Sequence, residues 1–406
     1  MADMAGCPVC GSDRRHELLH LRSIPTNNVV LFDDPAEARA WPRGSFRLAQ
    51  CLACGFVTNA DFRPELVEYS SRTEETQAFS PHFVGYATAL AQDWVQRHGL
   101  TGATVLEVGC GKAEFLALMC RAGVGAAIGY DPATHLDRLE ADVARRVTLV
   151  PQLFGEQELG LDADALVCRH TLEHIDAVSD FLALLRRWAQ RRRRPPVLLF
   201  EVPDLARILD EVAFWDLFYE HCSYFTADTL RRAFELAGFD VEDLRLVYDG
   251  QYLVLAARPR PVDAPVPTPR PAALAAGVAA GERFATRVRE ITARCRANVE
   301  HLAAEGPVVL WGGGSKAVAF LTVLGVEDLV EAVVDVNPHK QGKYLIGTGH
   351  PVVGPEYLVG RPDRQVVVMN PVYLAEIATM LDGLGAPAVL RSANDLLSDD
   401  IEGFAG

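Results

Sequence analysis

The chain has 406 residues, of which 49% are hydrophobic and 23% are charged, and these proportions are typical of globular proteins. The length exceeds what one hydrophobic core usually serves, so we expect two or three domains. The formal net charge of −15 argues against nucleic acid as a partner, because binding to a phosphate backbone requires a basic surface.

No apolar run reaches the roughly 18–20 residues that cross a bilayer. The first ten residues, MADMAGCPVC, lack the basic start and apolar core of a secretion signal. We therefore expect no membrane partner and a cytoplasmic location. In a reducing compartment, the nine cysteines are expected to be thiolate ligands or buried thiols. The sequence does not indicate an oligomeric state.

The first predicted module, residues 1–65, contains two copies of the pattern C-x-x-C-G. The four cysteines are Cys7, Cys10, Cys51 and Cys54. Each pair is typical of a zinc knuckle, in which a glycine with positive φ turns backbone amides toward the two sulfurs. A site of four thiolates leaves no open position, so we predict structural Zn²⁺. A redox C-x-x-C is the alternative, but it does not explain the duplication.

The second predicted domain, residues 66–258, begins with a polar stretch and a helix pattern at 84–99. From Thr104 onward, apolar strand patterns alternate with helix patterns, which predicts a parallel sheet covered by helices on both faces. The predicted strands end at Val108, Tyr130, Gln152, His170 and Pro203. Within the polar stretch, Tyr69 to Ser80 fits either a flap over a substrate cleft or a plain connector.

A glycine turn follows the first strand of this alternation. Glu107, Gly109 and Gly111 form the pattern E-x-G-x-G, and Asp131 ends the next strand twenty residues beyond Gly111. Glycines let backbone N–H groups approach a ligand, and the acid can accept hydrogen bonds from ribose hydroxyls. The pattern resembles motif I of class I S-adenosylmethionine (SAM)-dependent methyltransferases. An ordinary strand–turn–helix without a ligand is the alternative.

From this resemblance we predict SAM as the cofactor. The predicted cofactor-binding residues are Glu107, Gly109, Cys110, Gly111, Asp131, Gln152, Arg169 and His170. Gln152 is placed to contact adenine but also fits an exposed loop. Arg169 and His170 end the fourth strand, where class I enzymes often bind the methionine part of SAM.

Six prolines between Pro259 and Pro271 predict a stiff linker over residues 259–271. A third domain, residues 272–406, opens with a long Ala-rich helix pattern. It continues with a strand, the glycine turn GGGS, a helix and a strand that ends at Asp335. This repeats the combination of glycine turn and acid-terminated strand that is typical of a nucleotide site. Such a turn can also be only a packing device.

The segment at 218–226, FYEHCSYFT, lies after the fifth predicted strand and hence at the carboxyl edge of the sheet, where ligands bind. Histidine suits proton abstraction near neutral pH, and an adjacent carboxylate raises its basicity. The alternative is that Glu220 and His221 form a surface pair and that the aromatic residues belong to the core.

Together these pieces resemble the nucleotide-sugar C-methyltransferases of deoxysugar biosynthesis. The resemblance covers nearly the whole chain, and its most distinctive part is the string NPHKQGKYLIGTGHPV in the third domain. It implies a class I SAM domain closed by an antiparallel hairpin at 241–259, followed by a second Rossmann-like α/β domain. It also implies that this last domain helps to form the cleft for a nucleotide-linked sugar.

The same resemblance assigns roles to single residues. His221 becomes the catalytic base, with Glu220 beside it and His174 as a second catalytic histidine. Phe218 stands where the family often has tyrosine, so Tyr219 becomes the candidate for the displaced hydroxyl. The predicted substrate contacts are Tyr224, Ser315, Lys316 and Lys340, with Lys316 as the best candidate for a diphosphate contact.

The implied reaction is C-methylation of an NDP-4-keto-deoxysugar at carbon 3. The ketone acidifies the neighbouring C–H group, the base removes the proton, and the enolate carbon attacks the methyl group of SAM. Motif I departs from the E-I-G-S-N-D-G form that many of these enzymes have, which leaves the acceptor open. The rivals are O- or N-methylation of another small metabolite and a non-catalytic scaffold that retains the SAM fold.

Overall fold

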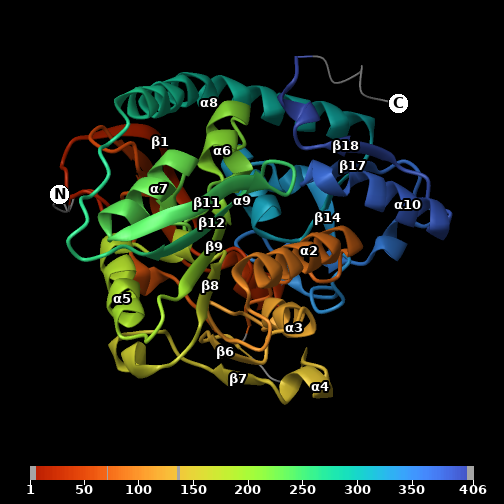
Figure 1. The fold of residues 1–406 in the computed structure, drawn as a ribbon. Coiled ribbons are helices and arrows are strands. Elements are labelled where there is room, and N and C mark those ends of the chain that lie inside the picture. Colours follow the sequence, from red (N-terminus) through yellow and green to blue (C-terminus); the bar gives the residue numbers. More distant parts are fainter. Residues whose placement is uncertain (1–5, 71, 135–137, 400–406) are drawn as a thin grey trace.

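The computed structural model describes residues 6–70, 72–134 and 138–399. The first five residues of the predicted zinc module and the last seven of the predicted third domain therefore lie outside the described residues. Figure 1 shows two α/β parts side by side, with the long helix α8 (Pro271–Glu305) extending along both of them. In the part of the chain that the structure describes, no helix is both long enough and apolar enough to cross a bilayer.

The central sheet has seven strands in the order β11-β12-β9-β8-β5-β6-β7. Its strands are β5 (Thr104–Val108), β6 (Ala126–Tyr130), β7 (Val147–Val150), β8 (Ala165–Arg169), β9 (Val197–Pro203), β11 (Phe239–Val247) and β12 (Tyr252–Pro259). The first five strands are parallel, and β12 runs antiparallel between β9 and β11. This order confirms the predicted class I methyltransferase fold and the hairpin that closes it.

Helices cover both faces of this sheet because their apolar stripes pack on strands that are buried on both sides. They are α2 (Pro81–His98), α3 (Glu114–Arg121), α4 (Ala141–Ala144), α5 (Val178–Gln190) and α7 (Ala227–Leu236). The helix α6 (Leu205–Glu211) packs instead against α8 and the N-terminal sheet. Helix α2 begins three residues before the predicted start, because the Ser80 hydroxyl accepts a hydrogen bond from Phe83 N and Pro81 suits the first turn.

The N-terminal sheet has the order β1-β3-β4-β10 and is antiparallel. Its strands are β1 (Arg15–Pro25), β3 (Arg43–Cys51), β4 (Val57–Asn59) and β10 (Ser223–Tyr224). The last of these belongs to the segment that follows β9, so the N-terminal sheet incorporates a strand from the predicted SAM domain. The remaining elements here are β2 (Leu31–Phe32) and α1 (Pro35–Arg39).

The C-terminal part contains a five-stranded parallel sheet in the order β16-β14-β13-β17-β18. Its strands are β13 (Val308–Trp311), β14 (Val330–Val334), β16 (Val352–Val353), β17 (Gln365–Val368) and β18 (Val389–Ser392), and its helices α9 (Ser315–Leu324) and α10 (Leu374–Leu384). The second Rossmann-like unit is thus confirmed. A small pairing of β15 (Tyr344–Leu345) with β2 joins it to the N-terminal part.

Short 3₁₀ helices complete the fold. They are η1 (Pro64–Leu66), η3 (Glu156–Gly160), η4 (Leu172–His174), η5 (Phe214–Asp216), η6 (Glu327–Leu329), η7 (Pro355–Leu358), η8 (Pro371–Tyr373) and η9 (Asp395–Leu397). Two of them join separate parts of the fold: η4, after the carboxyl end of β8, contacts β10 of the N-terminal sheet, and η5 packs against α9.

A tight contact in the N-terminal sheet predicts how it responds to substitution. A Cβ atom added at Gly44 would lie 2.3 Å from the ring of Tyr219, whereas one added at Gly277, on α8, would meet nothing within 4 Å. We expect Gly44→Ala to lower the free energy of unfolding by about 1–3 kcal/mol through overpacking. Gly277→Ala is the matched control and should be neutral or stabilising, because alanine favours helix.

Urea unfolding followed by circular dichroism measures both variants. Equal midpoints for Gly44→Ala and the unchanged protein would show that the Tyr219 ring moves freely, against this close packing.

Candidate active site

A cavity of about 670 Å³ lies where the carboxyl ends of the parallel strands of the central and C-terminal sheets meet. This volume is within the range that small-molecule sites usually have. The cavity is lined from the central sheet by the ends of β5, β6, β8 and β9, and from the C-terminal sheet by residues after β13, β14 and β17. The polar stretch before α2 provides a third wall, from Tyr69 to Ser80. The two halves of the chain therefore share one site.

The glycine turn after β5 has the geometry that its pattern predicts. Gly109 has φ 75° and Gly111 has φ 49°. A Cβ atom at Gly109 would lie 1.9 Å from the Thr171 hydroxyl oxygen, so only glycine fits there. Cys110 is buried, and its thiol lies 3.8 Å from the Thr134 hydroxyl.

Asp131 and Gln152 follow the neighbouring strands β6 and β7, and both line the cavity. The Asp131 carboxylate accepts hydrogen bonds from Gly111 N at 3.0 Å and from Ala133 N at 2.7 Å. These bonds hold the carboxylate at the glycine turn, the position that a ribose-binding acid requires. The structure thus brings the predicted cofactor residues to one edge of the sheet.

Arg169 and His170, which line the cavity, belong to a buried cluster of charged side chains. The Arg169 guanidinium pairs with Glu201, and His170 Nε2 lies 3.6 Å from the same carboxylate. Although burial opposes ionisation, these cations lower the pKa of Glu201 to about 2. Burial disfavours the His170 cation, but the facing carboxylates of Glu201 and Glu173 raise the pKa of His170 to about 9.

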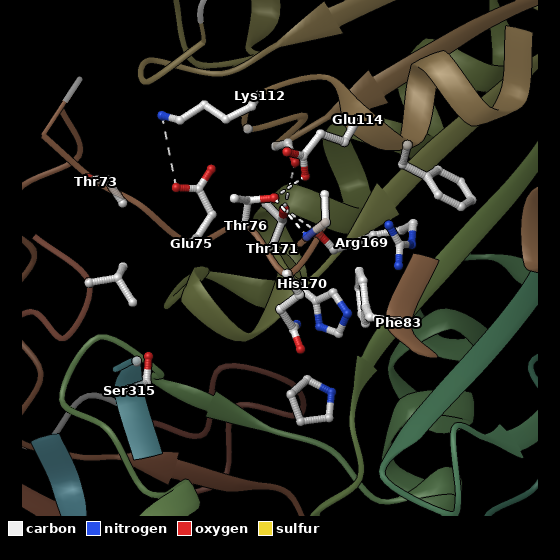
Figure 2. A pocket seen from close by; sticks show the side chains of 18 of the residues that line it. Thr73, Glu75, Thr76, Phe83, Lys112, Glu114, Arg169, His170, Thr171 and Ser315 are labelled. Atoms are coloured by element: carbon white, nitrogen blue, oxygen red, sulfur yellow. Dashed lines mark hydrogen bonds and ion pairs between the residues drawn. The ribbon is translucent and has the colours of Figure 1, made fainter. Parts of the chain in front are cut away.

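Glu107 behaves differently from Glu201. Burial raises the pKa of its carboxyl to about 8, and among the described residues its Oε2 atom has no hydrogen-bond partner. An unsatisfied buried oxygen is costly in a folded protein unless a ligand or water meets it. Glu107 thus provides an acceptor at the cavity wall. Figure 2 shows Arg169, His170 and Thr171 side by side in the cavity, with Glu75 and Lys112 across from them.

The predicted catalytic histidines lie together. The rings of His174 and His221 are 4.7 Å apart at an angle of 85°, and both line the cavity. The Tyr69 hydroxyl lies 3.2 Å from His174 Nδ1. Burial, and then the neighbouring His174, hold the pKa of His221 well below its usual value. His221 is therefore a neutral imidazole at neutral pH.

Glu220 and Phe218 complete this wall. The Glu220 carboxylate accepts a hydrogen bond from Asn27 Nδ2 at 3.2 Å, and burial raises its pKa. The Phe218 ring lies 4.8 Å from His221, so an aromatic edge stands where the resembling family often has tyrosine.

Two tyrosines that we predicted for the site lie outside it. The Tyr219 hydroxyl accepts a hydrogen bond from Arg63 N, and its ring packs in the core beneath the N-terminal sheet. The Tyr224 hydroxyl is bonded to both backbone groups of Phe218. Neither tyrosine lines the cavity. The structure therefore does not bring either tyrosine to the cavity surface: Tyr219 packs in the core, and the Tyr224 ring is buried 6.2 Å from the ring of His221.

The predicted substrate residues of the C-terminal part do line the cavity. They are Ser315, Lys316 and Lys340. Both lysines face carboxylates: Lys316 pairs with Asp216, and Lys340 Nζ lies 3.3 Å from Asp335 Oδ2. Burial lowers the pKa of Lys316. No sequence pattern indicates the pairing with Asp216, because the two residues are a hundred positions apart.

The stretch before α2 contributes a cavity-lining residue that we did not single out, Gln77, and a neighbouring residue, Glu74, that does not line the cavity but links its two sides. Glu74 accepts hydrogen bonds from Arg138 at 3.1 and 2.7 Å and from Asn337 at 3.0 Å. Tyr373 donates to Gln77 at 2.9 Å. The flap hypothesis for Tyr69 to Ser80 fits this placement, and the polar composition of the stretch was the available signal. It connects the two halves of the chain beside the cavity.

The four cysteines of the N-terminal module also converge. Their sulfurs all lie within 4.8 Å of one another, with Cys7 and Cys54 3.6 Å apart and Cys10 and Cys51 also 3.6 Å apart. Gly11 and Gly55 have φ 74° and 80°, as the knuckle pattern requires. The arrangement is a closed set of four sulfurs.

Comparison with known proteins agrees with this architecture. Residues 83–244 match the family model "Methyltransferase domain", and residues 273–386 match "C-methyltransferase C-terminal domain". The chain is 29% identical over 388 residues to the C-methyltransferase NovU of Streptomyces niveus, and the match spans 89% of each protein.

Two solved structures resemble the chain over somewhat less than half of its length. The 1,6-didemethyltoxoflavin-N1-methyltransferase of Burkholderia thailandensis is 21% identical, with a TM-score of 0.33, over 45% of this chain and 82% of that one. The magnesium protoporphyrin IX methyltransferase of Synechocystis PCC 6803 is 16% identical, with a TM-score of 0.33, over 44% and 83%.

The glycine turn yields a direct test of the cofactor site. We expect Gly109→Ala to weaken binding of S-adenosylhomocysteine at least tenfold, because the added Cβ collides with Thr171 and the positive φ becomes strained. Gly102→Ala is the matched control: Gly102 has φ 74° as well, but nothing lies within 4 Å of an added Cβ. Calorimetric titration measures both affinities, and equal weakening in the two variants would contradict the assignment.

Proposed function

We propose that this chain, a SAM-dependent methyltransferase of the group with a C-methyltransferase C-terminal domain, methylates a carbon atom of a nucleotide-linked keto sugar. The single observation that carries the proposal is the neutral His221 in a cavity shared by the SAM fold and the C-terminal domain. Methylation of carbon needs a base that removes a proton from the acceptor. A strongly nucleophilic oxygen or nitrogen acceptor depends less on such a base.

The residues present fit the cofactor. Gly109 leaves a cradle that a Cβ would fill, Asp131 is held at the turn, and Glu107 offers an unsatisfied acceptor. We assign Asp131 to the ribose hydroxyls and Gln152 to the adenine side. When bound, SAM supplies an electrophilic methyl group, so the protein's work is to position and deprotonate the acceptor.

His221 is the proposed base. A neutral imidazole has the free lone pair that proton abstraction requires, and the lowered pKa of His221 favours this form. His174 lies across the ring edge, with its Nδ1 atom near the Tyr69 hydroxyl. We assign His174 and Tyr69 to the hydrogen bonds that stabilise the enolate oxygen. Glu220, tied to Asn27, is assigned to orienting this segment.

The C-terminal side of the cavity is the proposed site for the nucleotide. Gly313 N donates to the Asp335 carboxylate at 2.8 Å, the same pairing of glycine turn and acid that Gly111 and Asp131 make. Ser315 begins α9, and the first turn of a helix favours anionic groups. Lys316 is our candidate for binding the diphosphate, which would replace Asp216 as its ion-pair partner. Nucleotide and sugar would then lie across the two domains.

The exchange of a C–H proton tests the proposal. Incubation of an NDP-4-keto-deoxysugar in D₂O with the enzyme and S-adenosylhomocysteine should introduce deuterium next to the ketone, detected by mass spectrometry. His221→Ala should reduce exchange and methyl transfer by roughly 10²- to 10⁴-fold with little change in S-adenosylhomocysteine affinity.

His301→Ala is the matched control, because His301 is a half-exposed helix residue that does not line the cavity. Methyl transfer to carbon without any dependence on His221 would remove the base from the proposal. Transfer to oxygen or nitrogen instead would favour the rival acceptor classes.

We further propose that the four cysteines bind structural Zn²⁺, as their closed set of sulfurs suits tetrahedral thiolate coordination.

The double variant Cys10→Ser/Cys51→Ser should lose zinc, as measured by elemental analysis, and should melt at a lower temperature. It should also lose methyl transfer, because β4, which follows the second knuckle, contacts the backbone beside His221. Cys295→Ala, in α8, should retain the zinc. Full methyl-transfer activity in the zinc-free variant would show that the active site does not depend on the zinc module.

A further inference from the structure

A second group of metal-ligating side chains lies inside the cavity. Glu173, His174 and His221 each present one ligand atom within 4.8 Å of the others. They come from two segments: η4 supplies the first two, and the loop after η5 supplies the third. All three line the cavity, so an ion could reach them from solvent.

Glu173 is the member that the reaction does not explain. Its side chain is 3% exposed, and among the described residues neither carboxylate oxygen has a hydrogen-bond partner. His170 Nδ1 lies 3.6 Å from Oε1, but the same imidazole also faces Glu201. A buried carboxylate on a cavity wall whose oxygens lack hydrogen bonds, and whose facing imidazole is shared with Glu201, is an arrangement that a further cation relieves.

The two histidines are prepared in complementary ways. The Tyr69 hydroxyl lies 3.2 Å from His174 Nδ1, and a hydrogen bond there leaves Nε2 free for a metal ion. Most histidines that bind a metal through one ring nitrogen likewise have a hydrogen-bond partner at the other. Among the described residues, neither ring nitrogen of His221 has a hydrogen-bond partner, so both are available to a ligand.

We propose that Glu173, His174 and His221 form a second metal site, for a borderline divalent ion such as Zn²⁺ or Co²⁺. Two imidazoles and one carboxylate are a ligand set that these ions accept, with open positions left for water. Bond lengths of about 2.1 Å require the ligand atoms to be about 3.4 Å apart, so atoms that lie within 4.8 Å of one another have to approach by at most about 1.4 Å. Side-chain rotation provides such a movement.

An ion at this site would inhibit methyl transfer, because it takes the lone pair of His221. This consequence rests on the proposed function, whereas the binding of the ion does not. A binding measurement therefore concerns the site alone, and an activity measurement concerns the base.

The binding test uses the full-length protein with Zn²⁺ already held by the four cysteines. Titration with Co²⁺ should give one further bound ion with visible d–d absorption and without the thiolate-to-cobalt charge-transfer band. Glu173→Gln and His221→Asn should each weaken this binding about tenfold or more. His301→Asn is the matched control, because it removes a histidine that lies 3.3 Å from Glu305 on the surface of α8.

Each outcome decides. Binding that is equal in the Glu173→Gln, His221→Asn and control variants, no binding, or binding with a thiolate band overturns the site. With the site present, Co²⁺ should inhibit methyl transfer and EDTA should restore it. A protein that binds Co²⁺ through these three residues but never methylates carbon would retain the site and reject the proposed function.

Discussion

The backbone of Cys222 is the point on which the site depends. Its carbonyl accepts hydrogen bonds from Asn59 N at 3.0 Å and the Thr58 hydroxyl at 2.6 Å, both in β4, and its N–H donates to Glu173 O at 2.9 Å. One residue thus connects the N-terminal sheet to η4. Because His221 precedes Cys222 and His174 follows Glu173, these bonds bring the two imidazoles face to edge. A rigid second knuckle would therefore help to hold β4, and through it the two histidines, in position.

Local sequence patterns were sufficient for the order of the strands in the central sheet and for the first strand–helix–strand unit of the C-terminal part. Glycine turns and acid-terminated strands repeat at Gly109–Asp131 and Gly313–Asp335, and each acid accepts a hydrogen bond from its turn. Such features arise within some twenty residues, where backbone sterics decide. The insertion of β10 into the N-terminal sheet could not be predicted this way, since its partner lies more than 160 positions away.

The positions of Tyr219 and Tyr224 away from the cavity lining have a similar origin. Side-chain direction in an irregular loop is set by what packs on it, and here the ring of Tyr219 fills the space that Gly44 leaves open. The Tyr224 hydroxyl closes a loop on the backbone of Phe218. Two adjacent residues can thus belong to a core and to a cavity. Resemblance to a family motif transfers residue types but not these directions.

The stretch before α2 determines how the cavity is closed. Glu74 accepts from Arg138 on the cofactor side and from Asn337 on the C-terminal side, while Ser80 donates to Glu376 at 2.9 Å. Hydrogen bonds to charged groups contribute about 1.5–3 kcal/mol each. Opening the cavity along this stretch would require breaking several of them together. Ligands that touch Gln77 or Thr76 would therefore act on both halves of the chain, because the same short segment is fixed to each.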